Sequence, residues 1–536
     1  MIYIKVKNIF FSSLITIIIG GIYYYFTYPV INPTSPEFWM FLLVIFIIFS
    51  VSYNIFNFNI TMSDFFNRRS YKTNYNYKMY YVVPIAFLGI IVLNFFLSPL
   101  FCSKSYYKRI KVSDGDFSKE VSEVNFNKMP LLDRDSSEKL GDRQMGQMSE
   151  LVSQFDVSNQ YTQINYNDEI IRVTPLEYNG IIKWFTNRKN GVTGYISVNS
   201  TTGKSRVIKL KNGMRYVPSA LFNENLYRKL QFSYPTFNFG SVDFEIDNSG
   251  KPYWVASVIK YTGVGLKRDV SGVVILDPVT GKSKYYDVKD VPKWVDHVYE
   301  ADLIIEQIND WGKYKNGFLN SLISQKGVVK TTRGYNYLAQ DDDIYLYTGV
   351  TSVISDESNI GFVLTNLRTK ETKYYPVSGA EEYSAMDSAK GQVQQMNYTA
   401  TFPLLINLNG NPTYLISLKD NAGLVKMYAF VDVDDYQKVV VTDSSKGIKK
   451  AAEAYLNEVM DDGDTSSSKN REVVINNLVN ASIDGNTYYY FTDQDGKKYK
   501  VSIKIDKNRL PFLKNGDTIN VSFDRESDVI NIIDIN

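Results

Sequence analysis

The chain is almost devoid of the two residue types that most often build metal and nucleophilic sites. Its 536 residues include one cysteine, Cys102, and one histidine, His297. A single cysteine excludes a disulfide framework and a thiolate metal cluster, and a zinc site at His297 would lack partner ligands. A Ser/His/Asp triad would also have to use His297, and no G-x-S-x-G motif accompanies it. We expect His297 to be an ordinary residue on the surface of a helix.

An excess of either charge is also missing. The chain has 59 Lys and Arg residues against 57 Asp and Glu residues. Nucleic-acid binding leaves a basic excess in a sequence, so the balance argues against that class. No P-loop or dinucleotide-binding fingerprint occurs. Aromatic residues are abundant instead, with 42 tyrosines, and this favours β-rich structure.

Charged residues are absent from three long apolar spans near the start of the chain. The spans lie between Lys7 and Glu37, between Glu37 and Asp64, and between Lys78 and Lys104. Each exceeds the roughly 20 residues that cross a bilayer, and the first is too long for the apolar part of a signal peptide. The absence of ionisable groups inside the spans indicates an anchor rather than a transport path. We predict a transmembrane anchor over residues 1–103, with helices at about 8–30, 38–58 and 79–101.

The basic residues of the short loops set the expected orientation. They precede the first span at Lys5 and Lys7, and they lie between the second and third spans at Arg68, Arg69, Lys72 and Lys78. The loop from Tyr28 to Glu37 has none. We therefore expect a cytoplasmic N-terminus and a large extracytoplasmic region after the third span. Lys104, Lys108, Arg109 and Lys111 oppose this orientation, and Cys102 is expected to pack at the outer membrane edge.

One phrase occurs three times at the same length after the anchor. The copies run from Gly194 to Leu210, from Gly272 to Val288 and from Gly361 to Val377. Each opens with glycine, has Asn or Asp at a central break and has Thr three residues later. Alternating apolar residues on both sides of such a break are typical of a tight β-hairpin. The spacing of the copies indicates a supersecondary unit that is used repeatedly.

Helix signals precede each hairpin and predict an α+β fold of tandem α-β-β-β modules. We expect these helices to begin near Asp135, Ser219, Asp290 and Ser378, and the first to reach Phe155. A connector covers residues 104–130. The repeat region covers 131–445, with modules at about 131–215, 216–289, 290–377 and 378–445.

The end of the chain has a different pattern. Residues 446–470 read as a helix followed by the polar linker Asp461 to Asn470. Five short strand signals with Gly and Asp turns then fill residues 471–536. This pattern predicts a small all-β barrel of the OB or SH3 type.

Two family resemblances follow from these patterns. The modules resemble PepSY-type modules, whose hairpin is similar to the stretch from Val274 to Lys282. The region from Asp114 to Thr442 also resembles an uncharacterised Firmicutes-type (Gram-positive) family of multi-pass membrane proteins, some of which carry an OB-like barrel. That second resemblance rests on four strings: Pro130–Gly146, Arg172–Gly180, Asp356–Glu371 and Thr399–Asp420. It implies no activity.

Few residues stand out as candidates for chemistry. Two acidic runs, Asp341 to Asp343 and Asp461 to Asp464, could hold calcium but are expected to be solvated loops. Asp493 to Gly496 lacks the glutamate that would complete a calcium loop and is expected to be a hairpin turn. Aromatic residues that could line a groove are expected to pack in the sheets instead; they are Trp184, Tyr253, Trp254, Tyr285 and Tyr286. No catalytic, cofactor-binding or metal-binding residue is assigned, and no cofactor is expected.

The function expected from the sequence is that of a non-enzymatic, membrane-anchored scaffold or binding protein of the cell envelope. Its expected partners are the lipid bilayer and an envelope protein or the cell wall, with no nucleic acid. Two other functions remain as alternatives. The first is a regulator or inhibitor of an envelope protease, which the PepSY resemblance implies. The second is a carboxylate-dependent cell-wall hydrolase, because a pair of acids facing a cleft leaves no sequence motif.

Overall fold

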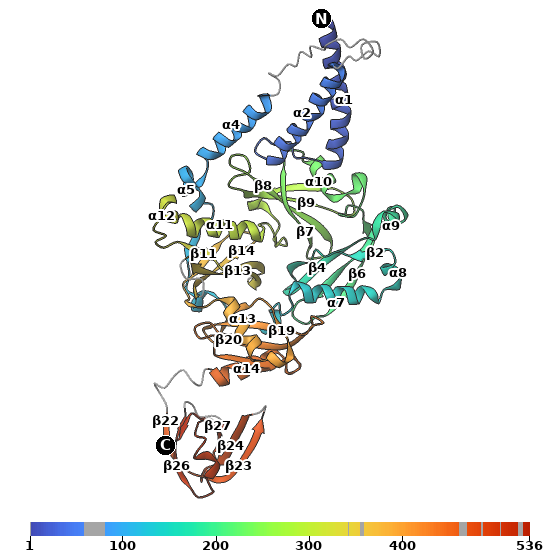
Figure 1. The fold of residues 1–536 in the computed structure, drawn as a ribbon. Helices are drawn as coiled ribbons and strands as arrows, with labels where there is room; N and C mark the ends of the chain where they lie inside the picture. Colours follow the sequence, from blue (N-terminus) through green and yellow to red (C-terminus); the bar gives the residue numbers. More distant parts are fainter. Residues whose placement is uncertain are drawn as a thin grey trace, which may run out of the picture. The chain divides into compact units, whose positions relative to one another are not determined.

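The structure is a computed structural model, and its chain forms two compact units, Met1–Gln437 and Lys438–Asn536 (Figure 1). The residues that it describes are 2–57, 81–340, 342–353, 358–459, 469–483, 486–503, 505–523 and 529–535.

The first unit begins with two long apolar helices, α1 (Ile2–Thr27) and α2 (Pro36–Asn57), each long enough to cross a membrane. The third predicted span is broken. Its residues form α4 (Val82–Phe96) and α5 (Pro99–Tyr107), which meet at an angle of 56°. Proline has no N–H and stops the preceding helix, so Pro99 accounts for the break. The basic loop at residues 68–78, used above to orient the chain, lies outside the described residues.

The ends of the apolar helices hydrogen-bond to the region that follows. After α1, the N–H of Ile31 donates to Pro235 O at 2.7 Å. On α4, the Asn94 side chain both donates to and accepts from the backbone of Val264, at 2.9 and 3.0 Å. After α5, the side chain of Arg109 is 5% exposed and pairs with Glu306 at 2.7 Å. The first and third apolar spans are therefore tied to the folded region by specific polar contacts.

Four largely antiparallel sheets follow along the described residues of the first unit, each accompanied by helices. The first sheet has the order β2-β4-β5-β6, with β3 beside β4, and the second has the order β7-β8-β9-β10. The elements of these two sheets are α7 (Arg134–Gly146), α8 (Ser149–Val152), β2 (Phe155–Val157), β3 (Thr162–Tyr166), β4 (Glu169–Tyr178), α9 (Gly180–Asn187), β5 (Val192–Asn199), β6 (Ser205–Met214), η3 (Phe222–Glu224), α10 (Leu226–Ser233), β7 (Asn238–Ile246), β8 (Pro252–Lys260), β9 (Asp269–Leu276) and β10 (Ser283–Asp287).

The third sheet is built around β13, β14 and β15, and the fourth around β18, β19 and β20. Their elements are η4 (Val288–Asp290), α11 (Ala301–Tyr314), α12 (Phe318–Leu322), β11 (Val329–Thr331), β12 (Asn336–Gln340), β13 (Asp343–Ser352), β14 (Ser358–Asn366), β15 (Thr372–Tyr375), β16 (Gly379–Ala380), α13 (Glu382–Gly391), η5 (Gln394–Met396), β17 (Thr399–Ala400), β18 (Leu404–Leu408), β19 (Asn411–Lys419) and β20 (Val425–Asp432).

Four helices differ from the sequence prediction. The helix expected near Ser219 begins at Leu226, after the short helix η3. The helix expected near Ser378 begins at Glu382, because Gly379–Ala380 form strand β16. The helix expected from Asp290 begins at Ala301, and the residues between contain Pro292 and adopt turns and extended backbone, so Val295, His297 and Val298 are not helical. The helix expected to reach Phe155 ends at Gly146, and Phe155 opens strand β2. For the helices expected from Asp290 and up to Phe155, the buried apolar residues belong instead to a loop or strand that packs on a sheet. The spacing of apolar residues alone does not distinguish such a segment from the buried face of a helix.

The three repeated phrases form the same hairpin. In each turn the backbone N–H of the residue at the break donates to the carbonyl five positions later. The bonds run from Asn199 to Lys204, from Asp277 to Lys282 and from Asn366 to Glu371, all at 2.9 Å. The side-chain oxygens of these three residues accept from the two N–H groups that lie two and three positions later. The fifth turn residue has positive φ in each copy, at Gly203, Gly281 and Lys370. The recurrence read from the sequence is thus a recurrence of structure at the hairpins.

Residues 104–130, predicted to be a connector, contribute a strand and a bridge to the sheets. Their strand β1 (Val112–Asp114) adds in parallel to β15, with Val112 opposite Thr372 and Asp114 opposite Tyr374. Farther along, Glu123 forms a parallel bridge with Asn407 of β18, and Ser417 of β19 donates to Leu131 O at 2.9 Å. Two short helices lie within this stretch, α6 (Phe117–Glu120) and η2 (Phe126–Lys128).

The second unit contains β21 (Val439–Asp443), the helix α14 (Ile448–Val459) that the sequence predicts, and a group of short strands. The strands form two sheets of order β22-β26-β28 and β23-β24-β25-β27 around a shared apolar core that includes Tyr499 and Phe523. The linker residues 461–468 lie outside the described residues. The remaining elements are η6 (Ser444–Lys446), β22 (Lys469–Val474), β23 (Asn476–Ile483), β24 (Asn486–Thr492), β25 (Lys498–Ser502), η7 (Leu510–Phe512), β26 (Thr518–Phe523), β27 (Val529–Ile532) and β28 (Asp534–Ile535).

Candidate functional site

Strand β6 forms an edge of the first sheet, since β5 is its one strand partner in the described chain. Its register with β5 places Ser197 opposite Arg206 and Val198 opposite Ser205. The bond from Asn199 N–H to Lys204 O fixes the alternation of this antiparallel pair. The backbone N–H and C=O groups of Ser205 and Val207 therefore point away from β5, along the open edge.

The corresponding edge in the third sheet is occupied. The same alternation in that hairpin directs the backbone of Thr372 and Tyr374 outward, and β1 binds there. The N–H of Gly115 donates to Tyr374 O at 2.9 Å, and the Ser113 hydroxyl donates to Thr372 O at 3.3 Å. Because the two hairpins share their turn, Ser205 and Val207 are the positions that match Thr372 and Tyr374. The β6 edge thus presents its backbone groups in the same way as the β15 edge, which binds the added strand β1 in the third sheet.

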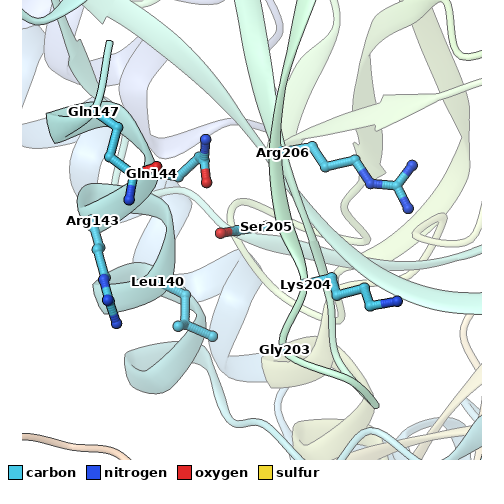
Figure 2. A pocket seen from close by; sticks show the side chains of 8 residues that line it. All are labelled: Leu140, Arg143, Gln144, Gln147, Gly203, Lys204, Ser205 and Arg206. Carbon is cyan, nitrogen blue, oxygen red and sulfur yellow. The ribbon is translucent and has the colours of Figure 1, made fainter. Parts of the chain in front are cut away.

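A groove lies beside the start of β6, between this strand and helix α7 (Figure 2). Its volume is about 440 Å³. One face of α7 lines one wall with Leu140, Arg143, Gln144 and Gln147, which are spaced as neighbours on a helix surface. The other wall is the β-turn and strand from Gly203 to Arg206.

The side chains around the groove do not converge on a single small ligand. Figure 2 shows the Ser205 hydroxyl directed toward α7, whereas Lys204 and Arg206 extend from the opposite face of the strand. Arg143, Lys204 and Arg206 are all exposed. The walls therefore offer amide, hydroxyl and aliphatic surface with cations at the rim, an arrangement that suits a side chain of a strand laid along β6.

The basic character continues along the edge strand. Lys209 and Lys211 follow Arg206 on β6, and both are exposed. Charged residues on an edge strand oppose uncontrolled pairing between copies. They also favour a partner segment with acidic residues, because complementary charge raises the association rate and fixes register.

A second polar cluster lies buried between the first three sheets. Glu245 on β7 is 0% exposed and accepts hydrogen bonds from the N–H groups of Asp296 and His297 at 2.9 and 3.1 Å. Asp296, 1% exposed, accepts from the N–H of Asn165 on β3 at 2.7 Å. The His297 Nε2–H donates to the backbone carbonyl of Gln163 at 2.7 Å. These contacts connect β3, β7 and the segment before α11.

Burial controls the ionisation of this cluster. Loss of hydration raises the pKa of Glu245 to about 7, although nearby His297 and the two N–H donors lower it. Burial together with the charge of Glu245 raises the pKa of Asp296 well above its ordinary value. Burial lowers the pKa of Arg172 on β4 to about 10. Because Glu245 and Asp296 are sealed from solvent and bound to backbone N–H groups, they hold the sheets together rather than face a cleft.

The residues that the sequence singled out lie apart from β6. His297 is half-buried in the cluster just described, and not on a helix surface as expected. Cys102 lies on α5 and is partly buried. In the described chain no group of three or more His, Cys, Asp or Glu side chains could hold a metal ion.

The acidic runs have separate places. Asp343 forms an ion pair with Arg368 at 2.6 Å, whereas Asp341 and the run from Asp461 to Asp464 lie outside the described residues. Asp493 to Gly496 form a hairpin turn, as expected, with the Asp493 carboxylate accepting from the N–H of Asp495 at 2.9 Å.

Four of the aromatic residues named above lie on the strands β8 and β10, as the sequence predicts, whereas Trp184 lies on helix α9. Trp184 and Trp254 are 1% and 0% exposed in the core shared by the first two sheets. Tyr253 packs against Trp294 with ring centroids 5.1 Å apart. Tyr285 donates its hydroxyl to Ser271 O at 3.1 Å, as Tyr374 does to Ile360 O at 2.8 Å in the next hairpin.

Sequence reasoning missed the β6 edge and the groove. The hairpin phrase was found, but which edge strand stays open depends on where β1 binds, and no local pattern in residues 112–114 marks them as a strand. The one available signal was the number of basic residues, Arg206, Lys209 and Lys211, in one strand.

Comparisons with known proteins give no assignment. No family model matches the chain, and no curated protein matches it. A crystal structure of an α-L-arabinofuranosidase from Lactobacillus brevis is similar at 8% identity, covering 70% of this chain and 95% of that one, with a TM-score of 0.16. A crystal structure of an ACO/RPE65 chimera is similar at 7% identity, covering 69% and 59%, with a TM-score of 0.13. Likeness at this level carries no argument about fold or activity.

Proposed function

We propose that this chain is a membrane-anchored protein of the cell envelope that binds an extended segment of a partner protein along the edge of β6. The observation that supports the proposal is β1, which occupies the matching edge of the third sheet by parallel strand addition. Main-chain hydrogen bonds to Ser205 and Val207 would supply affinity, and the α7 groove would select alternate side chains. The exposed cations of β6 favour an acidic segment.

Membrane anchoring is the second part of the proposal. It is supported by α1 and α2, which are apolar and long enough to cross a bilayer. The bent pair α4 and α5 would serve as a third crossing, and the sheets would lie outside the cytoplasm. The basic residues near the first helix and in the loop before α4 support this orientation.

The test uses a photo-crosslinking amino acid in place of Lys211 in the full-length protein in intact cells. Irradiation is expected to give an adduct whose crosslinked peptide is an extended segment of a partner. The adduct should disappear in a second protein that also carries Lys209→Pro, since the outward N–H of residue 209 is then lost. Proline is tolerated where the N–H of an edge strand faces solvent.

Lys209→Ala is the matched control, because it removes the same charge and keeps the N–H. Adduct yield in this variant should stay close to that of the parent. Thermal melting of the purified variants verifies that both retain the fold. Equal adduct yields with proline and alanine would show that binding does not use the strand edge and would overturn the proposal.

A further inference from the structure

Helix α9 presents a concentrated apolar surface. Its residues Ile181, Ile182 and Phe185 are 62%, 76% and 53% exposed, whereas Trp184 between them is 1% exposed. Phe222 of η3 adjoins this surface, with its ring 5.8 Å from that of Trp184, and is 50% exposed. Apolar residues gathered in this way, in contrast to single scattered ones, mark an interaction surface.

The exposure of Phe222 is imposed by its backbone. Its φ is +52°, a left-handed conformation that is unfavourable for a bulky residue. Arg228 of α10 holds this conformation by donating to Phe222 O at 2.6 Å. Strain that is maintained by specific contacts is characteristic of functional positions.

The Phe222 surface lies next to the end of membrane helix α1. The hydroxyl of Tyr25 donates to Asn223, the residue after Phe222, at 3.0 Å, and Arg228 donates to Tyr25 O at 2.9 Å. Tyr24 also stacks on Phe232 of α10 at 5.6 Å. Tyrosines gather at the membrane–water boundary of membrane proteins. The tyrosines that end α1 therefore place η3 and α10 at the level of the lipid headgroups.

A second apolar surface adjoins the end of α5. Leu319 and Leu322 of α12 are 67% and 58% exposed, and Ile323, directly after the helix, is 80% exposed. Helix α12 packs against α5, and Tyr314, just before it, contacts Tyr106 of α5 with ring centroids 6.0 Å apart. Each surface thus lies next to the end of an apolar helix, the first beside α1 and the second beside α5.

Exposed cations accompany both surfaces. Arg188 and Lys189 follow α9, and Lys313, Lys315 and Lys326 lie before and after α12. Long basic side chains can extend to lipid phosphates while neighbouring apolar residues enter the acyl region. Each surface therefore has the composition of an interfacial helix on an anionic bilayer.

We propose that α9 with Phe222, and α12 with Ile323, insert their apolar side chains into the leaflet from which α1 and α5 emerge. The partner is the lipid surface, and the two surfaces orient the sheets relative to the bilayer. This inference rests on the proposed membrane anchoring.

The test places a nitroxide label at Ile182→Cys or Ile323→Cys in the full chain, in a Cys102→Ser background. The protein is reconstituted in nanodiscs of phosphatidylglycerol and phosphatidylcholine, and collision rates with oxygen and with a polar nickel complex are measured. Both labels are expected to collide with oxygen several times more often, relative to nickel, than a label at Thr202→Cys in the exposed turn of the first hairpin. A ratio at either position equal to that at Thr202→Cys overturns the proposal.

A fourth label at Ile18→Cys, in α1, separates this proposal from membrane anchoring itself. A lipid-like ratio at Ile18→Cys with water-like ratios at 182 and 323 refutes the insertion and leaves the anchor in place. A water-like ratio at Ile18→Cys refutes the anchor, and the insertion with it. Ile182 and Ile323 are exposed, so the labels displace no core packing, and an unchanged melting temperature verifies the fold.

Discussion

At the scale of single residues, the chain concentrates its least ordinary chemistry in the cluster of Glu245 and Asp296. Both carboxyl groups are buried and receive backbone N–H donors from a different sheet or segment. Burying ionisable groups is costly unless hydrogen bonds compensate, and here the bonds join the first two sheets to the segment before α11. Stability should therefore depend on the protonation of these two groups.

We predict that unfolding stability falls as the pH rises from about 5 to about 8. The pKa of Glu245 is about 7 in the folded chain against 4.5 ordinarily. Between those values the folded chain binds more protons than the unfolded chain, so the contribution to stability is full at acid pH and is lost on passing pH 7. In Glu245→Gln this loss should be smaller, because the amide does not ionise. Denaturant unfolding at a series of pH values measures it.

The same variant should be less stable than the parent at acid pH by about 1–3 kcal/mol, since the amide nitrogen cannot accept one of the two N–H bonds. Stability curves of parent and variant that run parallel across the pH range would contradict the prediction.

At the scale of elements, the three hairpins differ in one respect, which is the state of their outer edge. The edge of β15 is covered by β1, whereas β6 and β10 each end their sheet in the described chain. All three carry the same turn and the same alternation of outward groups. This provides a comparison within one molecule between a covered edge and two open ones.

Hydrogen exchange should report this difference. The outward amides of Thr372 and Tyr374 are expected to exchange more slowly than those of Ser283 and Tyr285 on β10, because β1 removes the former from solvent. Ser113→Pro should weaken β1 and bring the exchange of the β15 amides toward that of β10. Mass-spectrometric exchange on the intact protein measures both. Protection of β15 that is unaffected by this substitution would show that β1 does not cover the edge.

At the scale of the whole molecule, the chain divides at Gln437 and Lys438 into units with separate cores. The buried side chains of the second unit's strands, among them Phe491, Tyr499 and Val521, contact one another within that unit. Because the strands from β22 to β28 bury their own apolar surface, they should unfold independently of the rest of the chain.

A protein comprising residues 469–536 alone is therefore expected to fold. Its thermal unfolding should be cooperative, and its midpoint should match one of two transitions in the full-length protein, as calorimetry would detect. A fragment that lacks a cooperative transition would show that these strands depend on the rest of the chain.

The sequence by itself determined the local structure of this protein. Apolar length fixed α1 and α2, and the Asn or Asp with a following Thr fixed the shared turns, because both signals act over neighbouring residues. The composition also excluded a disulfide framework and a thiolate metal cluster. The helix expected from Asp290 was wrong, since Val295 and Val298 are apolar because they pack between sheets, and burial leaves the same pattern in a loop as in a helix.

Only the tertiary structure decided which edges are open and which acids are buried. Residues 112–114 become a strand because β15 offers unpaired backbone groups, and this requirement lies about 260 residues away, between Val112 and Thr372. Glu245 and Asp296 look like ordinary surface acids in the sequence, and they acquire shifted pKa values because three sheets close around them. In both cases the stabilising contacts come from residues that are distant in the chain. No local sequence pattern therefore predicts the added strand or the buried acids.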